Sequence, residues 1–217
     1  MEDVILVNDK TQYGQEALSL AKDNMILRVD FTDMLKRTSH NRIYSELLVK
    51  AVGKKMLNSD TLVLDATAGL GEDAFLLAAA GLRVKMYERD ETIAKLLEDG
   101  LKRAACDEQL APVVSRMELV FADSIAAMED NSIKPDIVYL DPMFPQRTKS
   151  GLIKKKFQIL QQLESPCDEE DRLLNAALST DAKKIIIKRP LKGEYLACVK
   201  PSYSLKGRAI RYDCISR

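Results

Sequence analysis

The stretch TLVLDATAGLG, residues 61–71, constrains the fold of this chain more than any other. A short apolar run ends on Asp65 and is followed by a tight turn that contains Gly69 and Gly71. The next residues, EDAFLLAAAG, carry apolar side chains at the spacing of an amphipathic helix. A strand, a glycine turn and a helix in this order form the first unit of a doubly wound α/β sheet, in which ligands bind where the turn opens.

A second apolar strand, at residues 83–88, ends on Glu88, which lies 17 positions after Gly71. An acidic residue about 20 positions beyond such glycines is placed to bind the hydroxyls of a ribose. The simpler alternative is that Glu88 is a surface charge at the end of a strand. We predict that it binds the ribose of a nucleotide-like ligand.

The first two residues of the predicted helix, Glu72 and Asp73, bear on the charge of that ligand. From Gly69 the chain reads GLGEDA, which formally fits the dinucleotide fingerprint, but two carboxylates would repel a pyrophosphate at the helix N-terminus. They suit a cationic ligand such as S-adenosylmethionine, although acidic residues also stabilise a first helical turn by themselves. A nicotinamide-dependent oxidoreductase therefore stays open as an alternative at this point.

Strands and helices alternate along the rest of the chain, which predicts a parallel sheet covered by helices on both faces. Two final segments are predicted to form an antiparallel pair that closes the sheet. In order, the predicted strands are residues 62–65, 83–88, 117–122, 136–140, 184–188, 202–206 and 209–216. The predicted helices are residues 39–55, 72–80, 91–104 with Asp90 as N-cap, a short one after Asp123 and Ser124, 151–163 and 169–178.

The first 38 residues are predicted to form a small N-terminal extension or lid, and residues 39–217 the main domain. Within the extension, residues 4–7 and 25–31 are predicted as strands and residues 16–22 as a helix.

The composition, 46% hydrophobic and 30% charged in 217 residues, is typical of a soluble globular protein with one sizeable core. No apolar run approaches the roughly 20 residues that span a membrane, and the N-terminus carries acids where a signal peptide carries bases. We therefore expect a cytoplasmic protein. A single histidine, His40, and four cysteines without a C-x-x-C pair argue against a metal site or a disulfide framework.

Four segments carry a resemblance to a known family: ATAGLGEDAF, YERD, YLDPMFP and IIIKRP. Together they resemble class I S-adenosylmethionine-dependent methyltransferases, and more narrowly the ribosomal RNA small subunit methyltransferase J family, over residues 25–215. The resemblance implies a Rossmann-like, seven-stranded, mostly parallel sheet, S-adenosylmethionine as cofactor, and methylation of the exocyclic N2 of a guanine in 16S ribosomal RNA. By position, it implies cofactor contacts from Asp65, Gly69, Gly71, Glu72, Asp73, Glu88, Arg89, Asp123, Ser124 and Asp141.

The DPMFP turn suits methyl transfer to a base amine, which is a poor nucleophile because its lone pair is delocalised into the ring. The Asp141 carboxylate and the Pro142 carbonyl are candidates to accept the amine hydrogens, and proline fixes the direction of that carbonyl. Phe144 is placed to stack on a base extruded from its helix. We predict these three residues as catalytic, the alternative being a plain turn at the end of a strand.

Net charge is zero, with 33 basic and 33 acidic residues, so a globally basic nucleic-acid binder is not indicated. However, residues 142–163 contain five cations and no acid, and residues 195–212 contain four cations and no acid. We predict that the first span holds RNA phosphates, the alternative being a solvated helix face. Lys188 and Arg189 could likewise contact phosphate or only end their strand in solvent. The cations predicted to contact phosphate in the first span are Arg147, Lys149, Lys154, Lys155 and Lys156.

Two rivals to this function stay open beside the oxidoreductase. An N6-adenine DNA or RNA methyltransferase is one, because the DPMFP turn serves either exocyclic amine. The other is a non-catalytic RNA-binding protein that keeps the sheet but has lost methyl transfer.

Overall fold

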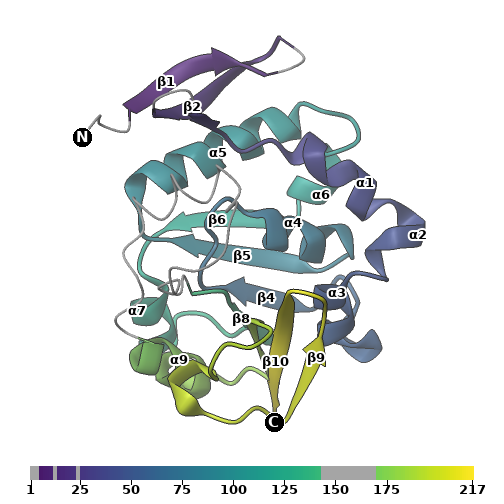
Figure 1. Ribbon diagram of the computed structural model, residues 1–217, viewed down its shortest axis with the longest axis vertical. Coiled ribbons are helices and arrows are strands. Elements are labelled where there is room, and N and C mark those ends of the chain that lie inside the picture. The colour runs from purple at the N-terminus through teal and green to yellow at the C-terminus, as the bar shows by residue number, and fades with distance from the viewer. Residues whose placement is uncertain (1–4, 12–13, 23–24, 143–169) are drawn as a thin grey trace.

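The structure is a computed structural model that describes residues 5–11, 14–22, 25–142 and 170–217 (Figure 1). Seven strands form its main sheet in the order β6-β5-β4-β7-β8-β10-β9. The first five are mutually parallel, and β10 is antiparallel to both of its neighbours. The predicted seven-stranded, mostly parallel sheet is therefore confirmed. Its strands are β4 (Leu62–Asp65), β5 (Arg83–Glu88), β6 (Met117–Phe121), β7 (Ile137–Leu140), β8 (Lys184–Pro190), β9 (Tyr203–Lys206) and β10 (Ile210–Ser216).

The strand order reverses at β4: β5 and β6 follow on one side, and β7 and β8 on the other. The central strands are buried on both faces, and all four residues of β7 are inaccessible to solvent. This burial explains why the sequence shows continuous apolar runs there instead of alternation. A reversal of this kind opens a crevice at the carboxyl ends of the strands, between β4 and β7.

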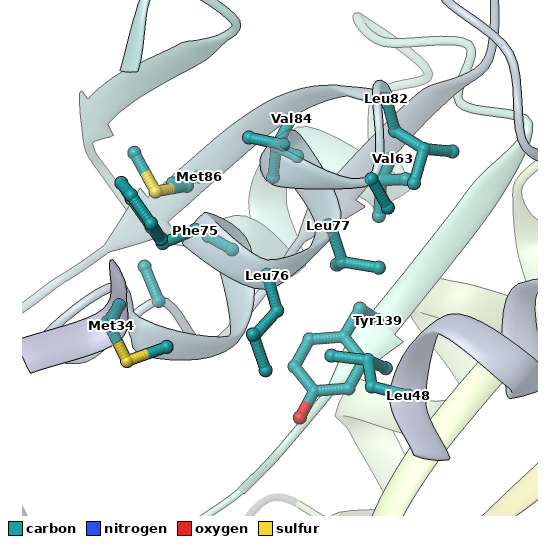
Figure 2. Close-up of a cluster of buried hydrophobic side chains, with 14 of the residues drawn as sticks. Met34, Leu48, Val63, Phe75, Leu76, Leu77, Leu82, Val84, Met86 and Tyr139 are labelled. Carbon is teal, nitrogen blue, oxygen red and sulfur yellow. The ribbon is translucent and has the colours of Figure 1, made fainter. Parts of the chain in front are cut away.

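Helices cover both faces of the sheet (Figure 1). On one face, Phe75, Leu76 and Leu77 of α4 lie in one buried cluster with Val63 and Tyr139 of the strands (Figure 2). On the other face, α7 and α9 contribute to a second buried cluster. No helix of the described residues is long and apolar enough to cross a membrane. The helices are α3 (Leu47–Val52), α4 (Glu72–Ala79), α5 (Glu91–Ala105), α6 (Ala111–Val114), α7 (Ser124–Glu129) and α9 (Glu170–Ser179).

The N-terminal part forms a separate three-stranded antiparallel sheet of β1 (Ile5–Lys10), β2 (Glu16–Lys22) and β3 (Met25–Leu27). The prediction of a helix at residues 16–22 was wrong. These residues include good helix formers, but residues 16–21 pair with β1, and the backbone N–H of Leu18 donates to Asp99 of α5. Tertiary pairing has overridden local propensity here. We retain residues 1–38 as a proposed extension of a domain at 39–217.

The segment after β3 joins this small sheet to the main one. It forms a 3-10 helix, η1 (Phe31–Met34), and a short helix, α1 (Leu35–Thr38), instead of the strand that was predicted to reach residue 31. Phe31 stacks on Phe75 of α4, with ring centroids 4.8 Å apart. Its packing anchors the N-terminal segment on the same face of the sheet as α4.

The single helix predicted at residues 39–55 is instead broken into α2 (His40–Ile43), α3 and a 3-10 helix, η2 (Lys54–Met56). The break falls at Glu46, whose backbone is extended with φ −60° and ψ 133°. Its carboxylate forms a bidentate ion pair with Arg37, at 3.0 and 2.9 Å. The ion pair spans this break, and α3 then packs against α4, β9 and β10 before the chain enters β4.

Candidate active site

The carboxyl ends of β4, β5, β7 and β8 bring charged side chains to one edge of the sheet. Asp65 ends β4, Glu88 ends β5 and Asp141 follows β7, as predicted from the sequence, and Lys188 lies near the end of β8. Beyond the end of β4, the N–H groups of Ala66 and Ala68 donate to backbone carbonyls of β7 and β5. The loop that contains the glycine turn is therefore fixed between its two neighbouring strands.

The glycine turn itself depends on glycine and on Glu88. Gly69 and Gly71 have φ values of +53° and +75°, a left-handed conformation that other residues adopt at a cost. A side chain at Gly71 would also approach Leu97 of α5 to 2.7 Å. The carboxylate of Glu88 accepts the N–H of Gly69 at 2.9 Å and the N–H of Asp90 at 2.8 Å. Glu88 thus holds the turn against the end of β5.

The side chains at this edge fit S-adenosylmethionine. The Glu88 carboxylate accepts the backbone N–H groups of Gly69 and Asp90, and the backbone of Arg89 also acts on it. A carboxylate has roughly four acceptor sites, so capacity for a ribose hydroxyl remains. Burial raises the pKa of Glu88 because it removes water that would solvate the charged carboxylate. A ligand hydroxyl that donates to Glu88 would replace this lost water. Asp73 and Asp141 add further carboxylates near the turn, and these acceptors suit a ligand with hydroxyls and positive charge.

Asp65 lies below the turn and not on its surface. It is 1% exposed, and its Oδ1 atom accepts the backbone N–H of Thr67 at 3.1 Å. Burial, together with the nearby carboxylates of Asp73, Asp141 and Glu88, raises the pKa of Asp65 to about 8. At neutral pH it is therefore mostly protonated, and it adds little negative charge to the edge.

Asp141 is held at two points. Its backbone N–H donates to Oγ1 of Thr67 at 2.7 Å, and its carboxylate accepts the ammonium of Lys188 at 2.7 Å. The same ammonium donates to Asp73 at 2.6 Å, and Asp73 also accepts the hydroxyl of Tyr139 at 2.6 Å. One chain of polar contacts therefore joins the first turn of α4 to the ends of β7 and β8.

The charges in this chain of contacts oppose one another. Burial raises the pKa of Asp141, the Lys188 ammonium lowers it, and the Asp73 carboxylate raises it again, so that the net direction is upward. Burial would also raise the pKa of Asp73, but its contacts with Lys188 and Tyr139 hold it below the ordinary value. The pKa of Lys188 is raised because the two carboxylates outweigh its burial.

Four other predicted cofactor residues lie around the turn. Asp123 caps α7, with its carboxylate accepting the N–H of Ile125 at 2.9 Å. The hydroxyl of Ser124 is buried and donates to the carbonyl of Ala66 at 2.8 Å, so it supports the loop. Glu72 and Arg89 are exposed. Their contacts with a cofactor stay predictions.

Of the predicted substrate residues, the structure describes few. Pro142 is buried, directly after Asp141. Arg189 is 5% exposed, and its guanidinium donates to the carbonyl of Glu194 at 2.8 Å and to the carboxylate of Glu170 at 3.4 Å. These contacts lend no support to a phosphate contact by Arg189. Phe144, Arg147, Lys149, Lys154, Lys155 and Lys156 lie outside the described residues.

Two residues of the site were missed in the sequence. Tyr139 sits in the apolar run DIVYL and is 1% exposed. A buried tyrosine hydroxyl usually has a hydrogen-bond partner, so a polar group opposite this strand could have been inferred. Thr67 offered no such signal, because its role depends on the distance from its loop to β7.

The fold and the site have the features of a class I S-adenosylmethionine-dependent methyltransferase. These are a reversal of strand order, a glycine turn after the first strand of the main sheet, acidic strand ends and an antiparallel strand β10 beside β8. The sequence model of a family described as "Putative SAM-dependent methyltransferase" matches residues 3–216. A solved structure of a SAM-dependent methyltransferase from Neisseria gonorrhoeae is 33% identical, with a TM-score of 0.74 over 92% of this chain and 79% of the other.

Two curated relatives carry a narrower name. "Ribosomal RNA small subunit methyltransferase J" of Pseudomonas fluorescens is 41% identical over 86% of this chain and 73% of its own length. The protein of the same name from Pseudomonas aeruginosa is 40% identical over 93% of this chain and 78% of its own length. The chain belongs to the ribosomal RNA small subunit methyltransferase J family.

Proposed function

We propose that the protein methylates the exocyclic N2 of a guanine in the 16S RNA of the small ribosomal subunit. The observation that carries this proposal is Asp141, fixed through its backbone by Thr67 and through its carboxylate by Lys188 beside the glycine turn. The relatives are named for small-subunit ribosomal RNA, which supports the choice of substrate. A cytoplasmic location, where that RNA is assembled into subunits, follows from the same substrate.

S-adenosylmethionine supplies a methyl group on a positively charged sulfur. We propose that Glu88 accepts hydrogen bonds from its ribose and that the turn at Gly69 and Gly71 lets the backbone approach it closely. Asp73 and Asp141 would supply the negative charge that suits a sulfonium bound at this edge. Much of the rate then comes from holding the amine in line with the methyl carbon, an effect worth up to about 7–11 kcal/mol.

The Asp141 carboxylate and the Pro142 carbonyl are proposed to accept the two hydrogens of the guanine amine. An acceptor on each hydrogen orients the nitrogen and draws electron density toward it. The amine nitrogen would gain the methyl carbon as the carbon–sulfur bond of the sulfonium breaks, and it would release one proton to solvent. An ionised Asp141 would stabilise the positive charge that builds up on the nitrogen before this proton leaves. Phe144 is proposed to stack on the base, and the basic residues from Arg147 to Lys156 to contact phosphates.

The experiment is methyl transfer from S-adenosylmethionine labelled in the methyl group to small-subunit RNA that lacks the modification, with DNA as the competing acceptor. We expect label in the RNA alone. Asp141→Asn replaces a charged acceptor with a neutral amide oxygen. Hydrogen bonds to charged groups are worth about 1.5–3 kcal/mol, so transfer should slow by up to roughly ten- to a hundredfold.

The matched control is Asp136→Asn. Asp136 precedes β7, the strand that Asp141 follows, and so lies at its opposite end. There it accepts the N–H of Leu62 and the ammonium of Lys183. Its loss should affect stability and leave the rate of transfer close to wild type. Label in DNA, or equal losses of rate in both variants, would contradict the proposal.

A further inference from the structure

We infer that Lys188 is a positioning residue: it bridges Asp73 and Asp141, places its positive charge between them and fixes the orientation of the Asp141 carboxylate. This inference rests on the proposed function, because Asp141 is the residue proposed to accept the amine hydrogens. It also gives Lys188 a role different from the phosphate contact predicted from the sequence.

The geometry of the bridge is specific. The Lys188 ammonium lies 2.6 Å from Oδ2 of Asp73 and 2.7 Å from Oδ2 of Asp141. The three side chains are 25%, 17% and 33% exposed, so these contacts are largely screened from water. An ammonium has three donors, and two of them are committed to carboxylates that come from different elements. The bridge ties the rotamer of Asp141 to the first turn of α4.

Further titratable groups surround this bridge. The Tyr139 hydroxyl donates to Asp73 from β7, and Asp65 lies near both carboxylates from the end of β4. Other groups whose charges act on the bridge are Arg37 of α1, Tyr212 of β10 and Arg189, which follows Lys188 on β8.

Electrostatics give the bridge a chemical consequence. Burial and the neighbouring Asp73 charge favour a protonated Asp141, and Lys188 opposes both. A protonated carboxyl donates a hydrogen bond from the oxygen that carries its proton, whereas an ionised one accepts at both. Without Lys188, two carboxylates would share one site, which strongly raises one of their pKa values. Asp141 would then be protonated over a wider range of pH and lose its function there.

The two possible roles of Lys188 predict different kinetics. A phosphate contact would act on RNA affinity and on its salt dependence. A positioning residue would act on the turnover number and on its pH profile, with the Michaelis constant for RNA nearly unchanged. In neither role does loss of Lys188 weaken cofactor binding, because removing a positive charge does not lower the affinity for a positively charged cofactor.

The experiment compares Lys188→Met with Lys184→Met in single-turnover methyl transfer at saturating cofactor and RNA, across pH. Lys184 is a matched control on the same strand, where its ammonium donates to the carbonyls of Ala51 and Val52 at the other end. We expect the acidic limb of the Lys188→Met profile to move up by about 1–3 pH units, with the rate recovering at high pH. Lys184→Met should keep the wild-type profile, and Lys188→Arg, which keeps the positive charge, should return the acidic limb most of the way to its wild-type position.

A charge-balance variant sharpens the test. In the double variant, Lys188→Met removes the ammonium and Asp73→Asn removes the charge of the second carboxylate, so Asp141 no longer has a carboxylate as its neighbour in the bridge. The acidic limb should then move back toward that of wild type, even where the absolute rate stays low. If the single variant keeps the wild-type limb, or raises the Michaelis constant for RNA tenfold at unchanged turnover, Lys188 is not a positioning residue.

A measurement without catalysis separates this inference from the proposed function. In cofactor-free protein with 13C-labelled aspartate carboxyls, the Asp141 signal is assigned by its loss in Asp141→Asn. Its titration midpoint should lie about 1–3 pH units higher in Lys188→Met than in wild type. An unchanged midpoint overturns the inference. If the midpoint moves but wild-type protein transfers no methyl to RNA, the proposed function fails and the bridge stands.

Discussion

The backbone N–H of Asp141 donates a 2.7 Å hydrogen bond to Oγ1 of Thr67, which joins the loop after β4 to the end of β7. The loop after β4 carries the glycine turn, and the end of β7 carries the candidate acceptor for the base. Beside the backbone hydrogen bond from Ala66 to Tyr139, this hydroxyl therefore links the loop proposed to hold the cofactor to the strand end proposed to hold the base.

Replacement of Thr67 tests this link. Thr67→Val keeps the shape of the side chain but leaves the Asp141 N–H without its partner, a loss of about 1–3 kcal/mol. We expect single-turnover methyl transfer to slow by roughly ten- to a hundredfold, with a smaller change in cofactor affinity. Thr67→Ser restores the hydroxyl and should restore the rate. Equal rates in the valine and serine variants would show that the hydroxyl has no part in catalysis.

Glu88 should matter for both cofactor binding and folding. Glu88→Ala removes the proposed acceptor for the ribose, so affinity for S-adenosylmethionine should fall by roughly ten- to a hundredfold in calorimetry. It also leaves the N–H groups of Gly69 and Asp90 without their partner, so the free energy of unfolding should fall by about 1–3 kcal/mol.

The matched control for Glu88 is Glu91→Ala. Glu91 lies in the first turn of α5 with an exposed side chain and pairs with Lys95. Its removal should leave cofactor affinity unchanged. Wild-type affinity in Glu88→Ala would remove Glu88 from the cofactor site.

The buried carboxyl of Asp65 predicts a pH-dependent stability. Its pKa is raised to about 8 in the folded protein and is about 4 in the unfolded chain. The folded state therefore holds this proton more tightly, and the stability that Asp65 contributes is full below pH 4 and is lost as the pH rises to 8, by up to about 1.4 kcal/mol per unit. Asp65→Asn cannot titrate. Its unfolding free energy relative to wild type should rise between pH 5 and pH 8 in denaturant titrations, and a constant difference would mean that Asp65 is ionised in the fold.

The elements that the sequence predicted best are the buried parallel strands. LVL, DIVYL and KIIIK are continuous apolar runs, and Asp65, Glu88 and Asp141 follow from the rule that ligands bind at strand ends. The N-terminal hairpin was not predictable in the same way, because EALSLAK becomes a strand only through its pairing with β1. The Lys188 bridge joins residues 115 positions apart and depends on side-chain placement, which spacing along the chain does not encode.

The basic span after the DPMFP turn predicts a salt effect on RNA binding. Each phosphate contact on a single strand contributes about 0.7 to the slope of log affinity against log salt, so losing two contacts in Lys154→Ala with Lys155→Ala should flatten the slope by about 1.4 units. Lys95→Ala with Lys102→Ala removes the same charge from exposed ion pairs on α5 and is the control. Identical slopes for the two double variants would make the basic span a solvated surface.

The identity of the methylated nucleoside tests the central claim most directly. Small-subunit RNA from cells that lack the protein is incubated with purified protein and S-adenosylmethionine carrying a 13C-labelled methyl group, then digested to nucleosides and analysed by mass spectrometry. We expect labelled N2-methylguanosine with wild-type protein and at least about tenfold less with Asp141→Asn. Labelled N6-methyladenosine, or no labelled nucleoside at all, would contradict the account.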